Sequence, residues 1–204
     1  DLRKVYRIRS KKFDQKRIPS EQIPTFLEDG WSIHKKEKGK ATVRRDKNLD
    51  ERIENLWWVL LYKMGYRELN RGRSFRVLIR KRHKEEIERP FSVFAADDET
   101  VIVTRCRTSD RFKKVNLSND LEQFASCKGE VATAIKNFYS GFKPKILWFY
   151  LTENIIWSDA DIATAAKNNI RRVTEQELPY FTQITDLLGK AARFQFLAEF
   201  LKDQ

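Results

Sequence analysis

Apolar residues recur with helical spacing between residues 50 and 64, and they predict the most strongly patterned helix of the chain. The spacing is i, i+3, i+4, i+7, i+8 and i+11, at Ile53, Leu56, Trp57, Leu60, Leu61 and Met64. Trp58, Val59 and Tyr62 widen this stripe, so we expect the helix to be buried on more than one side. Asp50 is the expected N-cap, and Gly65 the expected end.

Three strand patterns follow this helix, at residues 74–82, 90–96 and 100–108. The acidic turn at 97–99 predicts that the last two form a hairpin. A long amphipathic pattern then predicts a helix over 118–139. The nearly all-apolar run KILWFYLT, from residue 145, is typical of a strand covered on both faces. The order from 50 to 153 is αβββαβ, which indicates an α/β fold with a mixed sheet.

The flanking segments predict smaller elements. Residues 4–10 alternate as a short strand does, 20–27 favour a short helix, and 31–46 favour a hairpin turned at Gly39, with positive charge on one face. After residue 153 we expect a helix over 158–168, a strand over 170–174, and helices over 174–188 and 191–201. The predicted organisation is a basic, β-rich extension (1–49), a core (50–173) and a C-terminal helical pair (174–204) that leads to a downstream domain.

Composition supports a folded protein with an anionic partner. Hydrophobic residues make up 41% of the 204 residues, which is enough for a core and argues against disorder. The formal net charge is +12, and residues 1–49 carry 15 Lys/Arg against 7 Asp/Glu. Nucleic acid is the commonest partner of such a surplus. A role in solubility is the alternative.

The cysteines and the ends of the chain bear on location. Cys106 and Cys127 form no CxxC motif and lack clustered histidines, so we expect no zinc site and two free thiols in a reducing compartment. No apolar run approaches the length of a membrane span, and the N-terminus lacks a hydrophobic signal core. We predict a soluble, cytoplasmic protein. Residue 1 is Asp and the chain stops just after a helix, so we expect a fragment of a longer chain.

Four phrases of the sequence resemble one known family. They are WWVLLYKMGYRELN (57–70), FSVFAADDETVIVTRCRTSD (91–110), LTENIIWSDADIATAAKNNI (151–170) and YFTQITDLLGKAARFQFLAEFL (180–201). They are similar to the N-terminal, restriction-endonuclease-like region of DGQHR-domain proteins, which is of the PD-(D/E)xK type. The DGQHR motif itself is absent from this chain. The resemblance implies a restriction-endonuclease-like core and a role in prokaryotic DNA modification or defence.

The resemblance also places the family's catalytic positions on this sequence. Where the family pattern has a metal-binding Asp, this chain has Ser92, and where the pattern has Glu-x-Lys it has Arg105 and Arg107. Glu54 matches a helix carboxylate that often assists the metal, and it is retained. The family uses carboxylates to hold Mg²⁺ against the scissile phosphate and lysine to orient the attacking water. With two arginines in place of a carboxylate and a lysine, we expect a degenerate pseudo-nuclease without metal cofactor or catalytic residues.

Two alternatives remain open for these positions. In the first, Mg²⁺ binds at relocated ligands that include Glu54 and Asp97, and the chain is an active DNA endonuclease. In the second, the arginines are structural and pair with Glu54 and Asp110. Against these stands an anion-binding site, because Arg105 and Arg107 alternate on a strand and project to one face, with Cys106 facing the opposite layer.

Other basic residues predict a nucleic-acid-binding surface, which we expect to include Arg80, Arg82, Lys36, Lys38, Arg44 and Arg45. A solvated face is the simpler interpretation. The aromatic residues of the central helix and strand are expected to pack in the core, and His34 and His83 to lie at the surface. We therefore predict a module that binds nucleic acid, most readily DNA, or serves assembly with a downstream domain or a second copy. A pure protein-interaction scaffold is the remaining alternative.

Overall fold

The structure is a computed structural model that describes residues 1–204 except 74, 81–85, 142 and 202–204, and except the side chains of residues 80, 86–88 and 201. The helices are α1 (Leu2–Arg9), α2 (Ile23–Glu28), α3 (Leu49–Lys63), α4 (Ser118–Phe138), α5 (Asp159–Lys167), α6 (Leu178–Leu188) and α7 (Ala192–Leu201), with 3-10 turns η1 (Ser20–Gln22) and η2 (Gly189–Ala191). The strands are β1 (Phe13–Pro19), β2 (Ser32–Glu37), β3 (Lys40–Asp46), β4 (Glu68–Leu69), β5 (Phe75–Arg80), β6 (Glu86–Phe91), β7 (Val93–Ala96), β8 (Thr100–Lys114), β9 (Lys145–Ile156) and β10 (Ile170–Thr174).

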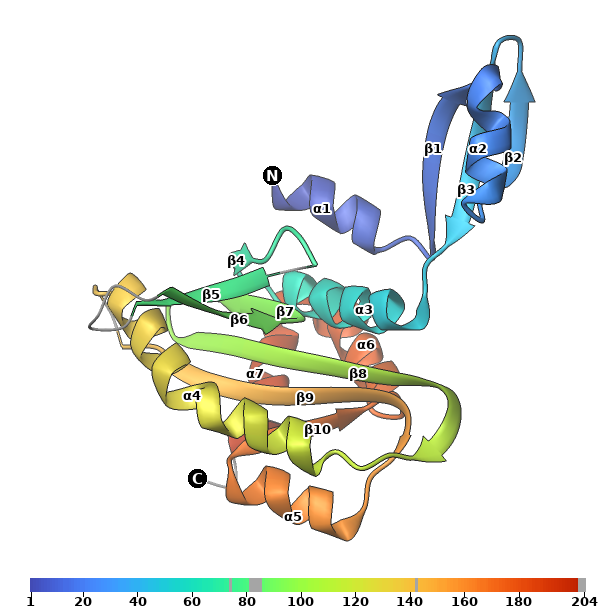
Figure 1. The fold of residues 1–204 in the computed structure, drawn as a ribbon. Helices are drawn as coiled ribbons and strands as arrows, with labels where there is room; N and C mark the ends of the chain where they lie inside the picture. The colour runs from blue at the N-terminus through green and yellow to red at the C-terminus, as the bar shows by residue number, and fades with distance from the viewer. Residues whose placement is uncertain (74, 81–85, 142, 202–204) are drawn as a thin grey trace.

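A five-stranded mixed sheet organises the described residues, in the order β10-β9-β8-β7-β4 (Figure 1). Strands β8, β9 and β10 are parallel, whereas β7 is antiparallel to both β8 and β4. Helix α4 is the crossover that allows β9 to run parallel to β8. The predicted α/β class with a mixed sheet is confirmed, as is the hairpin turned at residues 97–99.

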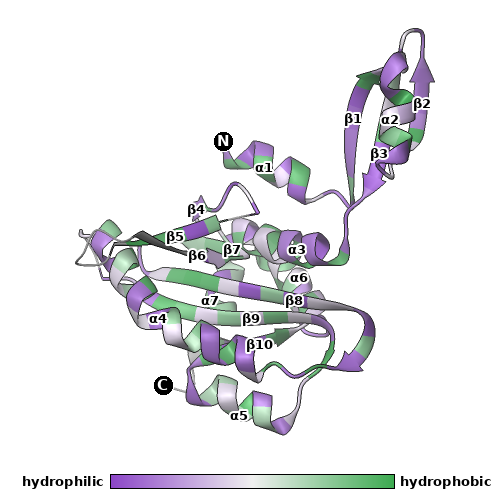
Figure 2. Ribbon diagram, in the orientation of Figure 1, coloured by the Kyte–Doolittle hydropathy of each residue, from purple (hydrophilic) through white to green (hydrophobic). Residues whose placement is uncertain are grey.

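Helices cover both faces of the sheet, and the alternation along β9 shows why its sequence is so apolar. Leu147, Phe149 and Leu151 pack on one face with α3, α6 and α7, while Trp148 and Tyr150 pack on the other with α4 and α5 (Figure 1). Hydrophobic residues accordingly line β8 and β9, whereas the outlying β1–β3 unit is largely hydrophilic (Figure 2). The C-terminal pair α6 and α7 thus belongs to the same apolar cluster as α3.

The tryptophans are core residues. Trp57 and Trp58 of α3 are fully buried, and each indole N–H finds an acceptor: Thr104 Oγ1 at 2.9 Å and the carbonyl of Asn70 at 2.8 Å, respectively. Trp31 and Trp157, whose setting the sequence left unsettled, are buried too. The prediction that the aromatics of the central helix and strand pack in the core is confirmed, so they offer no stacking platform for bases.

The N-terminal segment forms two structures rather than one. Residues 4–10, which were predicted to be a strand, form part of helix α1, because Leu2, Val5 and Tyr6 are spaced as one helical face and pack against the α3 cluster. Residues 13–46 then form a small antiparallel sheet, β1-β3-β2, with α2 on one face. The hairpin at Gly39 is confirmed, with φ +74°. Strand β1 was not predicted.

Two further expectations need correction. The run 90–96 is not one strand: it divides at Ser92 into β6 and β7, and β6 pairs with β5 in a separate two-stranded sheet. The first of the three predicted strands therefore lies outside the main sheet, whose edge is the short β4. The N-cap of α3 is Asn48, whose side chain accepts from the Glu51 N–H at 2.8 Å, and Asp50 lies in the first turn instead.

Within the described residues, no helix has both the length and the apolar character that a membrane crossing requires.

Candidate functional site

A cleft opens where β8 outlasts its neighbour in the sheet. Strand β7 pairs only with residues 101–104 of β8, whereas β8 continues to Lys114 with β9 on its other side. A cavity of about 580 Å³ lies along this stretch, with α3 and the start of α4 at its sides. It is lined by Glu54, Arg73, Arg76, Pro90, Phe91, Ser92, Arg105, Cys106, Arg107, Asp120, Gln123 and Tyr150. The four positions that the family resemblance singled out thus converge on one cleft.

Arg105 is held by aromatic rings rather than by a carboxylate. Its guanidinium carbon lies 5.2 Å from the ring centre of Phe124 and 5.8 Å from that of Phe91. Among the residues that the structure describes, no carboxylate lies within ion-pair distance of Arg105. Cys106 packs with the α3 cluster on the opposite face, as the alternation predicted, and burial raises the pKa of its thiol. Aromatic rings therefore orient the Arg105 guanidinium, and no described carboxylate forms an ion pair with it.

Arg107 is engaged by a carboxylate. Its guanidinium forms an ion pair with Asp120 at the start of α4, and the Tyr150 hydroxyl donates to the same carboxylate oxygen at 3.1 Å. Burial raises the pKa of Tyr150 to about 12, so this hydroxyl keeps its proton at neutral pH. The predicted network of Glu54, Asp110 and the two arginines is wrong, because Arg107 selects Asp120 and Asp110 is exposed.

Glu54 and Ser92 are both committed to local bonds. The Arg73 Nε donates to Glu54 Oε2 at 2.9 Å, and burial raises the pKa of Glu54 despite this arginine. The Ser92 hydroxyl accepts the Cys106 N–H at 2.9 Å, which satisfies a donor of β8 where β7 has ended. Mg²⁺ is usually held by one or two carboxylates together with waters and substrate phosphates, so its site needs carboxylates that are not already paired with cations. This cleft instead offers one carboxylate paired with Arg73, another paired with Arg107, and four arginines, so the residues do not fit Mg²⁺.

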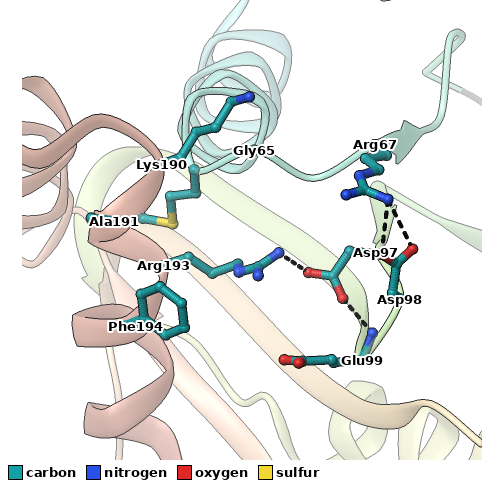
Figure 3. A pocket seen from close by; sticks show the side chains of 10 residues that line it. Gly65, Arg67, Asp97, Asp98, Glu99, Lys190, Ala191, Arg193 and Phe194 are labelled. Carbon is teal, nitrogen blue, oxygen red and sulfur yellow. Dashed lines mark hydrogen bonds and ion pairs between the residues drawn. The ribbon is translucent and has the colours of Figure 1, made fainter.

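Asp97 lies at the other end of the hairpin, in a separate cavity of about 310 Å³ that shares no lining residue with the cleft. Its carboxylate accepts from the Glu99 and Thr100 N–H groups, at 2.8 and 2.7 Å, and pairs with Arg193 of α7 (Figure 3). The acidic turn is thus not simply a solvated tip, because Asp97 is buried, whereas Asp98 and Glu99 are exposed. The structure does not bring Asp97 and Glu54 together as shared metal ligands. No cluster of three metal-binding side chains occurs in the described part of the chain.

Four of the other predicted basic residues lie in the β1-β3-β2 unit and do not line the cleft. Lys36, Lys38, Arg44 and Arg45 belong to the β2–β3 hairpin, and Arg44 and Arg45 lie on opposite faces of its sheet, since Arg45 stacks on Trp31 beneath α2. Arg80 ends β5, but its side chain is outside the described residues, as are Arg82 and His83. His34 is exposed on β2, as predicted.

Sequence reasoning missed Arg73, Arg76, Asp120 and Tyr150. Tyr150 was read only as a core residue, although its hydroxyl reaches the cleft. Asp120 lies in the first turn of α4, where a carboxylate is expected for the helix dipole alone, and nothing in its spacing connects it to Arg107. Arg73 lies in the loop after β4, whereas Arg76 lies in β5, a strand that was predicted without any indication that it borders the cleft. Their part in the cleft depends on how the loop after β4 folds back toward α3.

Comparison with known proteins gives no family. No protein-family model matches the chain, and no curated protein matches it in sequence. Among solved structures it is similar to protein VC1899 from Vibrio cholerae (14% identity, TM-score 0.47, covering 94% of this chain and 51% of that one). It is also similar to a protein of unknown function, AF1548 (13%, TM-score 0.44, covering 62% and 58%). A third is Can2 from Sulfobacillus thermosulfidooxidans in complex with cyclic tetra-adenylate (11%, TM-score 0.42, covering 89% and 50%). The chain spans little more than half the length of these structures, and the likenesses are distant.

Proposed function

We propose that this chain binds nucleic acid through the arginine-lined cleft, on a restriction-endonuclease-like core that has lost its catalytic residues. The support from the fold is the arrangement of elements around the cleft. A helix, α3, precedes an antiparallel hairpin, β7–β8, and a crossover helix leads to a parallel strand, β9. The resemblance to DGQHR-domain proteins implies this order for residues 50–153. The exception is the first of the three predicted strands, β5, which pairs with β6 outside the main sheet.

One observation carries the proposal: Arg73 and Arg107 of the cleft have carboxylate partners, whereas Arg105 has none among the described residues. Arg105 in particular has a guanidinium held over two rings with no carboxylate beside it in the described residues. A guanidinium presents paired N–H donors that match two oxygens of a phosphate group, and it keeps its charge at any physiological pH. Such a cleft is suited to the phosphate backbone of a nucleic acid.

The test is a salt titration of binding to duplex DNA, measured by fluorescence anisotropy. Arg105→Glu combined with Arg107→Glu is expected to weaken binding by at least ~10-fold, because the first change replaces a phosphate contact by a repulsion and the second leaves Asp120 and a new carboxylate unpaired in the cleft. The matched control is Lys36→Glu combined with Lys38→Glu, which changes net charge equally on exposed residues outside the cleft. The affinity of the wild-type chain should fall steeply as salt rises.

Equal losses in the two double variants would show that the cleft is not the site. Binding without salt dependence, or none at all, would favour a protein-interaction scaffold. The same samples, incubated with supercoiled plasmid and Mg²⁺ or Mn²⁺, test the endonuclease alternative. We expect no cleavage, and cleavage lost in Glu54→Ala would contradict the pseudo-nuclease proposal.

A further inference from the structure

The small β1-β3-β2 sheet has one face that its own core does not use. Helix α2 covers the other face, where Ile18, Trp31, Ala41 and Val43 are buried. Because cross-strand partners point to the same side, the register places a second set of residues on the uncovered face. These residues are exposed or half-buried, and they are Phe13, Gln15, Arg17, Pro19, Ser32, Lys35, Glu37, Lys40, Thr42, Arg44 and Asp46. We call this set the open face. The unit that carries it extends away from the five-stranded sheet (Figure 1).

Arg44 lies at the centre of the open face, and its side chain is fixed before any ligand arrives. Its guanidinium carbon stacks 4.2 Å from the ring centre of Phe13, and its Nε donates to Gln15 Oε1 at 3.0 Å. Both contacts come from β1, which pairs with the central strand β3. With the inner nitrogen bound, the two terminal nitrogens form the end of a planar fork. No ion pair to Arg44 occurs among the described residues.

Charge on the open face favours an anionic ligand. Its basic residues are Arg17, Lys35, Lys40 and Arg44, and its acidic residues are Glu37 and Asp46. Glu37 already pairs with Arg17 and with Lys35, the latter at 3.0 Å, and these two cations hold the pKa of Glu37 below its usual range. The uncovered part of the sheet near Arg44 therefore combines a fixed cation with small polar side chains at Ser32 and Thr42.

The dimensions of the sheet favour duplex DNA over duplex RNA. Adjacent strands lie ~4.8 Å apart, so the outer strands β1 and β2 are separated by roughly 10 Å. The major groove of B-form DNA is ~12 Å wide and is read by sheets as well as by helices. The major groove of A-form RNA is too narrow and deep for side chains to read. An arginine fork is the donor arrangement that matches the O6 and N7 acceptors of guanine in the DNA groove.

We propose that the open face of the β1-β3-β2 sheet docks in the major groove of duplex DNA, with Arg44 as the residue that contacts base edges. This deepens the proposed function and rests on the same ligand class, but it concerns a second surface, outside the cleft. The two surfaces make separable contributions: the cleft holds phosphate, and the open face supplies groove contacts.

The experiment measures binding of the full chain to a mixed-sequence DNA duplex and to an RNA duplex of the same sequence. Arg44→Gln is expected to weaken DNA binding ~10-fold, and Arg44→Lys almost as much, because lysine keeps the charge but has no fork. The matched control is Lys36→Gln, which removes one positive charge from the same sheet. Lys36 pairs with the buried Ala41 and so lies on the side of α2, away from the open face, although its charge had predicted it to be part of the nucleic-acid-binding surface. We expect it to weaken binding by no more than ~2-fold. RNA binding should be weaker than DNA binding and insensitive to Arg44.

A second variant distinguishes loss of the Arg44 contact from loss of the fold. Phe13→Leu keeps every charge but removes the ring on which Arg44 stacks, and it is expected to weaken DNA binding with an unchanged thermal melt. Arg44 variants that bind as well as Lys36→Gln, while the Arg105 and Arg107 double variant loses binding, would overturn the open-face inference and leave the cleft standing. The reverse pattern would support the open face and overturn the cleft. Equal affinity for DNA and RNA would overturn groove docking.

Discussion

Arg105 and Arg107 are separated by one residue on β8 and project to the same face, yet their surroundings differ. Arg107 is neutralised by Asp120, which also receives the Tyr150 hydroxyl. Arg105 stacks on Phe91 and Phe124 and keeps its charge uncompensated among the described residues. An arginine stacked on rings loses little mobility when it binds an anion, because its orientation is already set. Within the cleft we therefore assign the larger share of anion binding to Arg105.

Asp97 provides a comparison between a buried and an exposed carboxylate in one turn. It bonds to two backbone N–H groups and to Arg193, with a side chain only 4% exposed. Asp97→Ala should therefore lower the free energy of unfolding by roughly 3 kcal/mol, since it leaves buried donors and a cation unpaired. Urea denaturation measures the effect.

The neighbouring Asp98 is the control for this prediction. It is 73% exposed and pairs with Arg67, which is equally exposed. Asp98→Ala should cost less than about 1 kcal/mol. Equal losses in the two variants would contradict a structural role for the Asp97 carboxylate.

At the scale of elements, the Glu153 carboxyl lies on β9 between α3 and α6, where burial makes its charged form unfavourable. Burial raises the pKa of Glu153, and Glu175 and Asp50 add to the effect while Arg52 opposes it. A pKa that is higher in the folded than in the unfolded state means that folding is favoured when the group is protonated. This contribution is complete below the ordinary carboxyl pKa and is lost as pH rises through the folded value.

Glu153→Gln is therefore expected to raise the melting temperature at neutral pH, where the wild-type carboxylate is charged. The gain should disappear below pH ~4, where the unfolded chain is also protonated. Glu122→Gln, an exposed carboxyl change on α4, serves as the control in the same pH series of thermal melts. A gain that does not depend on pH would contradict this account.

Elements with a long, regular pattern were predictable, and short ones were not. Helix α3 and strand β9 followed directly from their apolar spacing because each is buried by several neighbours. Residues 4–10 were wrongly predicted to be a strand, because a seven-residue segment fits both the helical and the strand period. Only the packing of Val5 and Tyr6 on α3 favours the helix. The division at Ser92 depends on β6 pairing with β5, a contact that no local pattern encodes.

The candidate cleft was predictable only as far as the family resemblance reached. Alignment of phrases brought Glu54, Ser92, Arg105 and Arg107 together, and all four line one cavity. Their partners were not predictable, because Arg73 comes from a loop and Asp120 from a helix terminus, and tertiary packing alone sets these pairings. Function at this site remains a proposal that the binding experiments decide.

At the scale of the whole molecule, Arg9 joins α1 to the core. Its guanidinium is buried, donates to Asn55 Oδ1 at 3.2 Å and to the Gly72 carbonyl at 3.1 Å, and lies over the ring of Trp58. Arg9→Ala removes both the bonds and the packing of a long side chain, so we expect a loss of roughly 2–3 kcal/mol in the free energy of unfolding.

The same change should detach α1 and expose the segment after it. Limited trypsin digestion is expected to cut faster at Lys11 and Lys12 in Arg9→Ala than in the wild type. Arg7→Ala, at an exposed position of the same helix, is the control. An unchanged cleavage rate in Arg9→Ala would show that α1 is held by its apolar face alone.

The β1-β3-β2 unit enters and leaves the rest of the molecule at a single point, because the Lys47 N–H donates to the Lys12 carbonyl at 3.3 Å. A chain segment whose two ends meet in this way can be gained, lost or exchanged without changing the path of the chain on either side. Joining residue 12 to residue 47 would excise residues 13–46 while leaving α1 and α3 connected. The open face is therefore carried on an insertion that can be removed or exchanged at one junction of the chain.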